Sequence, residues 1–157
     1  MIDQISMSET LLDAAKEVFE TMIFMSITEK EDQEAAIVGN AYLGTISFKG
    51  DIAGCLGVTF EEAAAKAVAA NMLCLEPDEA VSEADLADAV GEVANMVMGG
   101  VKSRLLGEIG SIELSIPTVI SGRTLKSNVG DCTSRIVKRV HVDAFEGELS
   151  FLARSNG

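Results

Sequence analysis

The chain has 157 residues, of which 48% are hydrophobic and 24% charged, and it contains 14 glycines and 2 prolines. This composition is typical of a folded domain with a buried core, and it excludes a mainly disordered or collagen-like chain. With 12 basic and 25 acidic residues, the formal net charge is −13. Such a charge disfavours nucleic acid and membrane surfaces as partners, because both are anionic. The length predicts a single domain over residues 1–157.

The N-terminus lacks the basic and apolar regions of a signal peptide, and no apolar run is long enough to span a membrane. We therefore expect a cytoplasmic protein. Its cysteines, Cys55, Cys74 and Cys132, are odd in number and widely spaced, and His141 is the sole histidine. This pattern predicts buried, reduced cysteines and no metal site.

The first predicted helix covers Ser6–Ile27. Ser6 and Glu9 have the spacing of a capping box at its start. An apolar stripe recurs along it at helical intervals, at Leu11, Ala15, Val18, Met22 and Met25. We therefore expect these five side chains in the core.

A hairpin and a short helix follow. Two β-like segments, Ala35–Phe48 and Ile52–Thr59, are joined by the turn sequence Lys49-Gly50-Asp51. The alanine-rich segment Phe60–Leu73 then predicts a helix.

A third, longer helix begins after Ser82 and runs to about Leu106. Ser82 and Asp85 have the spacing of residues that cap the start of a helix. Alternating apolar residues then predict strands at Ile112, Leu114 and Ile116, at Arg135–Val142, and at Glu148–Ala153 after a turn at Glu146-Gly147. This order predicts an α/β or α+β domain with a mixed or antiparallel sheet covered by long helices.

The first and third helices match at an offset of 75 residues, in apolar positions and in two acidic ones. Asp13 matches Asp88, and Glu17 matches Glu92. The match indicates an internal duplication.

The third helix has a polar stripe opposite its apolar one. At about 100° per residue, the i, i+4, i+7, i+11 spacing of Asp88, Glu92, Asn95 and Gly99 places them on one face. A solvated face is the ordinary explanation for Glu92. Asn and Gly are unfavourable in a helix interior, Gly by about 1 kcal/mol relative to Ala. Close approach of another backbone and internal packing of Gly99-Gly100 are both open explanations.

The segment from Asp88 to Gly100, DAVGEVANMVMGG, with Pro117 downstream, resembles the signature of the CheC, CheX and FliY phosphatases of bacterial chemotaxis. In that signature an Asp or Ser precedes a Glu, an Asn and, further on, a Pro. The order of helices and glycine-rich hairpins extends the resemblance over nearly the whole chain.

The resemblance implies a helix that docks on a phosphorylated CheY-type response regulator and hydrolyses its aspartyl phosphate. Asn95 would orient the attacking water, and Glu92 would pair with the receiver's active-site lysine. Asp88, Met96 and Gly99 would contact the partner. The Mg²⁺ would belong to the receiver, and this chain would bind no cofactor or metal itself.

The first helix carries Glu20 and Phe24 where the third carries Asn95 and Gly99. One working site therefore remains, which resembles CheX more than CheC. The likeness to CheX implies a homodimer, and we expect its contact along the edge strand Glu148–Ala153. The alternative is a catalytically silent adaptor that binds a receiver or a flagellar switch component. A small-molecule esterase is not supported, because the sequence has no nucleophile elbow.

Overall fold

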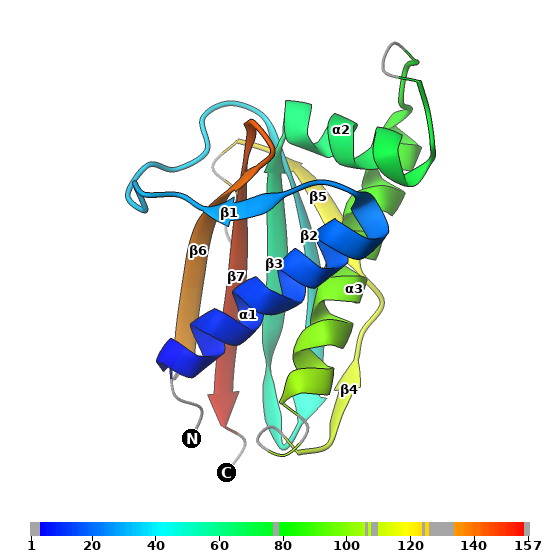
Figure 1. Cartoon of the computed structure of the whole chain (residues 1–157). Helices are drawn as coiled ribbons and strands as arrows, with labels where there is room; N and C mark the ends of the chain where they lie inside the picture. The colour runs from blue at the N-terminus through cyan, green and yellow to red at the C-terminus, as the bar shows by residue number, and fades with distance from the viewer. Residues whose placement is uncertain are drawn as a thin grey trace.

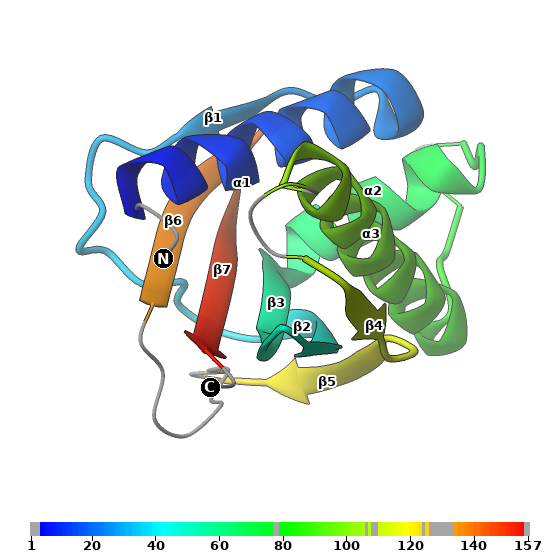
Figure 2. The ribbon, with the colours of Figure 1, turned by 90° about the horizontal axis from the view of Figure 1, so that it is seen from below.

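The computed structural model describes residues 4–76, 79–105, 107, 110–123, 125 and 134–155. Within these ranges an antiparallel sheet is covered on one face by two long helices, α1 and α3, and at one end by a shorter helix, α2 (Figure 1, Figure 2). The elements are α1 (Gln4–Val18), the π-helical turn η1 (Phe19–Ile23), β1 (Ile27–Glu29), β2 (Ala41–Gly50), β3 (Ile52–Glu61), α2 (Glu62–Met72), α3 (Glu83–Arg104), β4 (Ile112–Leu114), β5 (Thr118–Gly122), β6 (Ser134–Val142) and β7 (Phe145–Ser155). The predicted α+β class is confirmed, and the sheet is antiparallel.

The order of the strands has an internal two-fold pattern. It runs β1-β6-β7-β3-β2-β4, and β5 also pairs with β2. The β2–β3 hairpin of the first half and the β6–β7 hairpin of the second half meet through β3 and β7. Short strands of the opposite half then pair with each outer strand, β1 with β6, and β4 and β5 with β2. This symmetry supports the duplication inferred from the two helices.

Helix α3 lies against β2. The predicted apolar stripe is buried at Leu86, Val90, Val93, Val97 and Val101. Arg104, which the same spacing places at its end, is exposed and forms an ion pair with Glu17. A Cβ at Gly44 on β2 would lie 2.9 Å from the Val90 carbonyl oxygen, so the close approach of helix and strand depends on glycine there. The Ser82 hydroxyl accepts a hydrogen bond of 3.1 Å from the Asp85 N–H, as predicted for the N-cap. The stripe and the cap together fix which face of α3 points outward.

The first helix is wound differently from the prediction at its C-terminal end. After Val18 it continues as η1, and a π turn takes an additional residue. The buried positions of this turn are therefore Phe19 and Ile23 instead of Met22. Met22 is 60% exposed, so its predicted place in the core is wrong. The helix ends at Phe24, which has a left-handed φ of 62° and is 76% exposed.

The last strand lies in the middle of the sheet, and the predicted edge at Glu148–Ala153 is wrong. These residues belong to β7, which pairs with both β3 and β6 because the two hairpins meet there. The turn before β7 is also earlier than predicted and includes Asp143, at φ 52°. Gly147 lies within the strand, where a Cβ would lie 3.1 Å from the Thr59 carbonyl oxygen. That glycine serves close strand packing instead of the turn.

Several boundaries differ from the prediction, among them the end of the first helix, at Ile23 instead of Ile27, and the start of α2, at Glu62 instead of Phe60. Helix α1 begins at Gln4, before Ser6, and β2 begins at Ala41 instead of Ala35. Residues 31–40 form a connecting loop, because its polar residues and Gly39, at φ 90°, do not continue the strand.

Of the cysteines, Cys55 is buried, as predicted. Cys74 is exposed, and its predicted burial is wrong: it lies beyond the end of α2 with a φ of 56°, off the buried face of the helix. Cys132 lies outside the described residues. Among the residues described, no helix is long and apolar enough to cross the hydrocarbon core of a membrane.

Candidate functional site

The outward face of α3 carries the predicted site. Asp88, Glu92, Asn95 and Gly99 are all exposed, and we call these four residues the docking stripe. Met96 is half-buried beside them. Within the part of the chain that the structure describes, the side chains of Glu92 and Asn95 form neither a hydrogen bond nor an ion pair. Their polar groups are therefore available to another molecule.

The two adjacent glycines of α3 differ in their surroundings. A Cβ at Gly100 would lie 3.2 Å from the Ala14 Cβ, so this glycine allows α1 and α3 to pack closely. Among the described residues, a Cβ at Gly99 would have no atom within 4 Å apart from the nearby backbone of its own helix. Internal packing therefore explains Gly100 and does not explain Gly99. Because Gly99 has no side chain, the backbone of α3 is exposed at this position of the docking stripe.

One side of the docking stripe is bordered by the segment between β4 and β5. Pro117 packs against α3 at Gly91, where a Cβ would lie 3.3 Å from the proline Cβ. The segment is fastened to β2, because the Ser115 N–H donates to the Ser47 carbonyl at 2.9 Å and the Ser115 Oγ accepts from the Ser47 N–H at 3.0 Å. Ile116 was expected in a strand but lies outside β4 and is 85% exposed. The signature proline thus fixes an apolar border beside the site.

The other side is bordered by a groove between α1 and α3, which we call the α1–α3 groove. Its volume is about 310 Å³. Its small and apolar lining comprises Ala14, Val18, Met22, Met96, Gly99 and Gly100. An ion pair and hydrogen bond between Glu17 and Arg104 lie on its rim. The groove and the docking stripe share Gly99, so they form one continuous surface.

Helix α1 lacks an equivalent of the docking stripe. Glu17, which corresponds to Glu92, is paired with Arg104. Glu20 is exposed and adds a second negative charge. Phe24 does not lie on the helix at all, because the π turn and the left-handed residue end it there. The predicted degeneracy therefore extends from residue type to backbone geometry.

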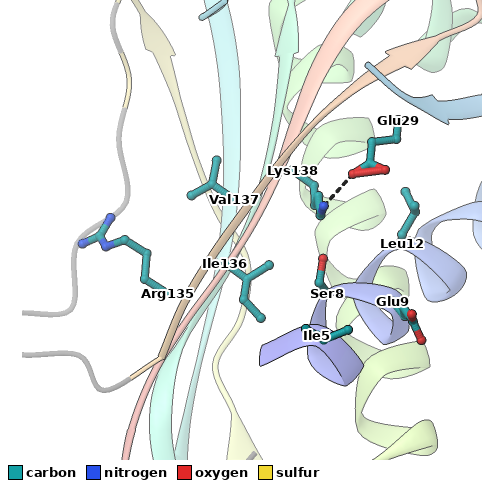
Figure 3. Close-up of a pocket in the computed structure, with 9 residues that line it drawn as sticks. All are labelled: Ile5, Ser8, Glu9, Leu12, Glu29, Arg135, Ile136, Val137 and Lys138. Atoms are coloured by element: carbon teal, nitrogen blue, oxygen red, sulfur yellow. Dashed lines mark hydrogen bonds and ion pairs between the residues drawn. The ribbon is translucent and has the colours of Figure 1, made fainter. Parts of the chain in front are cut away.

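A second groove separates the N-terminal part of α1 from the outer edge of β6 (Figure 3). Its volume is about 490 Å³, and an ion pair joins Lys138 of β6 to Glu29 of β1 at one end. Ile136 and Lys138 point toward α1, whereas Arg135 and Val137 point away from it (Figure 3). This groove lies apart from the docking stripe, since they have no lining residue in common.

The titration of Tyr42 is perturbed at the N-terminal end of α3. Burial raises the pKa of its phenol above the ordinary value, and the negative charges of Glu83 and Glu62 raise it further. Tyr42 is buried in the core, so its role is in packing under the helix ends and not in surface chemistry.

The docking stripe offers hydrogen-bonding and charged groups. The stripe holds an amide, carboxylates and an accessible stretch of backbone, but no hydroxyl, thiol or imidazole nucleophile. Among the described residues, no group of three His, Cys, Asp or Glu side chains is arranged to hold a metal ion. The Asn95 amide and the Glu92 carboxylate can donate or accept hydrogen bonds with a molecule that covers this face.

The model of the family described as chemotaxis phosphatase CheX matches residues 42–138, which span the hairpin, the docking stripe and the signature proline. The chain belongs to the CheX family. A search of curated protein sequences gave no match.

Solved structures of CheX proteins have the same fold. The chemotaxis protein CheX from Vibrio vulnificus is 22% identical, with a TM-score of 0.79, over 95% of this chain and 99% of that one. The CheX protein from Desulfovibrio desulfuricans is 26% identical, with a TM-score of 0.75, over 94% and 99%. The CheX chain in a CheX–CheY–BeF₃–Mg²⁺ complex from Borrelia burgdorferi is 23% identical, with a TM-score of 0.75, over 99% and 100%.

Two features of the surface around the site were not predicted from the sequence, namely the exposure of Met22 and the tethered Ile116. One sequence signal for the π turn exists: the apolar residues Phe19 and Ile23 lie beside the predicted apolar stripe instead of on it. No sequence signal indicates the hydrogen bonds between Ser115 and Ser47, because these residues are distant in the chain and meet only through strand pairing.

Proposed function

We propose that this protein is a phosphatase that hydrolyses the aspartyl phosphate of a CheY-type response regulator. The observation that carries the proposal is the docking stripe, where the unpartnered side chains of Glu92 and Asn95 lie beside the open backbone at Gly99. Glycine costs a helix about 1 kcal/mol relative to alanine, and no contact among the described residues requires glycine at this position. Entry of α3 into a partner's active site explains it.

In this mechanism Asn95 holds the attacking water in line with the phosphoryl group. An aspartyl phosphate is already an activated acyl phosphate, so catalysis consists mainly of positioning and electrostatic stabilisation. A neutral amide holds water without adding negative charge beside the phosphoryl oxygens, whereas a second carboxylate there would repel them. Glu92 pairs with the receiver's active-site lysine and so fixes the depth and orientation of Asn95. Mg²⁺ is supplied by the receiver and not by this chain.

Membership of the CheX family supports this proposal, and so does the Borrelia burgdorferi structure, in which a CheX protein is bound to CheY in the presence of BeF₃ and Mg²⁺. Asp88, Met96 and Gly99 would then contact the receiver around Glu92 and Asn95. The expected location in the cytoplasm belongs to the same proposal.

The decisive experiment measures how fast a phosphorylated CheY-type receiver loses phosphate with substoichiometric protein. The parent chain should accelerate the loss, and Asn95→Ala should lower turnover by a factor on the order of 10² while the helix remains folded. Glu20→Ala is the matched control on α1, and it should stay within about a few-fold of the parent. Receiver binding without acceleration by the parent would indicate the silent adaptor instead. Full activity of Asn95→Ala would remove this residue from the mechanism.

Glu92 has a separate test, because its role is in docking as well as orientation. Glu92→Lys places a positive charge opposite the receiver's lysine and should weaken binding and turnover together. Binding is measured by titration of a receiver activated with beryllofluoride and Mg²⁺. Unchanged affinity would place Glu92 outside the interface.

We also propose a homodimer, formed along β6. In the described part of the chain, β1 pairs only with Val140–Val142 along the outer edge of β6. At the next outward-facing residue, the Gln33 side-chain amide accepts a hydrogen bond from the Arg139 N–H and donates one to the Arg139 carbonyl. The backbone N–H and C=O groups of alternate residues point to the same edge of a strand. Those of Val137 therefore point to the same edge as those of Arg139, beyond the end of β1, and can pair with a strand of another molecule. Val137→Pro should give a monomer mass by light scattering without loss of helical circular dichroism, since a proline at an open edge removes no internal hydrogen bond. A monomeric parent chain would contradict the proposal.

A further inference from the structure

We infer that the α1–α3 groove is a second contact site for the response regulator and receives an apolar side chain that borders the regulator's phosphorylation site. The inference rests on the proposed function, because it takes the receiver as the partner. It assigns a role to Met22 and to the π turn, neither of which belongs to the phosphatase signature.

The position of the groove identifies its occupant. Gly99 belongs both to the docking stripe and to the lining of the groove, and Met96 lies between the two. Since α1 and α3 lie side by side on the same face of the sheet, a body that covers the outward face of α3 also lies over the groove (Figure 2). The protein that meets Asn95 is therefore the one that meets the groove.

The lining of the groove determines the chemistry of the contact. Its apolar part consists of the buried Ala14 and Val18 and the flexible thioethers Met22 and Met96, while Gly99 and Gly100 add no side chain. The hydroxyl groups of Thr21 and Ser103 also line it. The charges on the rim, Glu17 and Arg104, neutralise each other in an ion pair. The volume of about 310 Å³ equals that of roughly ten water molecules, which is enough for one large side chain. An apolar guest fits this lining, and methionines adapt their shape to it.

The π turn supports a binding role for Met22. An uninterrupted α-helix would place Met22 in the core, following Val18 by one turn. Instead, η1 places Ile23 in the core, leaves Met22 60% exposed and is followed by Phe24 in a left-handed conformation, which is unfavourable for a bulky residue. The π turn is the last turn of this helix, where the N–H groups of Phe24 and Met25 both donate to the Phe19 carbonyl. Here the turn moves a large apolar side chain from the core to the edge of the docking surface.

The test compares Met22→Lys with Met22→Leu and with Val38→Lys. The control residue Val38 is 89% exposed in the loop before β2 and is not among the residues that line the α1–α3 groove. The dissociation constant is measured against a CheY-type receiver activated with beryllofluoride and Mg²⁺, and KM and kcat against the phosphorylated receiver. Each variant is first compared with the parent by circular dichroism and urea unfolding.

Met22→Lys should raise the dissociation constant and KM by about 10-fold or more, at nearly constant kcat, because it affects docking and not the reacting groups. Met22→Leu and Val38→Lys should bind like the parent. Parent-like binding by Met22→Lys overturns the inference alone, as does a loss confined to kcat. If the parent binds no receiver, the proposed function fails and the inference fails with it. If the parent binds without catalysis and Met22→Lys binds more weakly, the inference stands and the phosphatase proposal fails.

Discussion

Replacement of Gly99 by alanine tests whether the helix has given up stability at this position. In the part of the chain that the structure describes, the methyl group would meet no atom within 4 Å outside the nearby backbone of its own helix, so the change removes the backbone freedom of glycine without creating a clash there. The helix propensities of Gly and Ala differ by about 1 kcal/mol. For a chain of this length, that gain raises Tm by about 3 °C. We expect Gly99→Ala to unfold at a higher urea concentration than the parent, with an unchanged m-value.

Gly100→Ala is the matched control, because it gains the same propensity one residue further along the helix. Its methyl group would lie 3.2 Å from the Ala14 Cβ and 3.2 Å from the Arg104 guanidinium, so α1 and α3 must move apart. Its urea midpoint should therefore be lower than that of Gly99→Ala. Equal midpoints for the two variants, or a midpoint of Gly99→Ala at or below that of the parent, would refute this reasoning. In the phosphatase assay, Gly99→Leu should be folded and slow, since the larger side chain stands between α3 and the receiver.

Three further predictions concern other parts of the molecule. Tyr42 is the only tyrosine and the chain has no tryptophan, so ultraviolet titration should report its raised pKa directly; because the folded state retains the phenol proton, stability should fall as pH rises above about 10. The double variant Asn95→Ala/Glu20→Asn should remain inactive in the phosphate-loss assay, because α1 has no counterpart of Gly99 after the new amide. Recovered activity would contradict this. Gly91→Val should lower the free energy of unfolding by about 1–3 kcal/mol through overpacking against Pro117, as measured by urea unfolding, and Gly91→Ala should lower it less.

Local patterns in the sequence predicted the parts of the fold that depend on local physics. The buried stripe of α3, its cap at Ser82 and the hairpin turn near Gly50 follow from helical periodicity, hydrogen-bonding side chains and glycine. The exposed positions of Glu92 and Asn95 follow from the same periodicity. The candidate site could be placed on the outward face of α3 for this reason.

What the sequence did not predict depends on packing between distant segments. The middle position of β7 results from the meeting of two hairpins, and a single strand carries no signal of its neighbours. Gly147 was interpreted as a turn residue, although it serves close packing against Thr59. The π turn before Phe24 interrupts a period that otherwise reads as regular helix, so Met22 was placed in the core.

The exchange of short strands between the two halves determines how this chain must fold. Ile27 pairs with Val142 and Tyr42 with Ser121, so neither half completes its sheet without strands from the far end of the chain. Contacts of such long sequence separation lower the rate of folding, because the loops must close before pairing stabilises them. Neither half should therefore fold as an autonomous unit, and a nascent chain should acquire its structure only after β7 has been synthesised. The two halves should therefore unfold together as one cooperative unit.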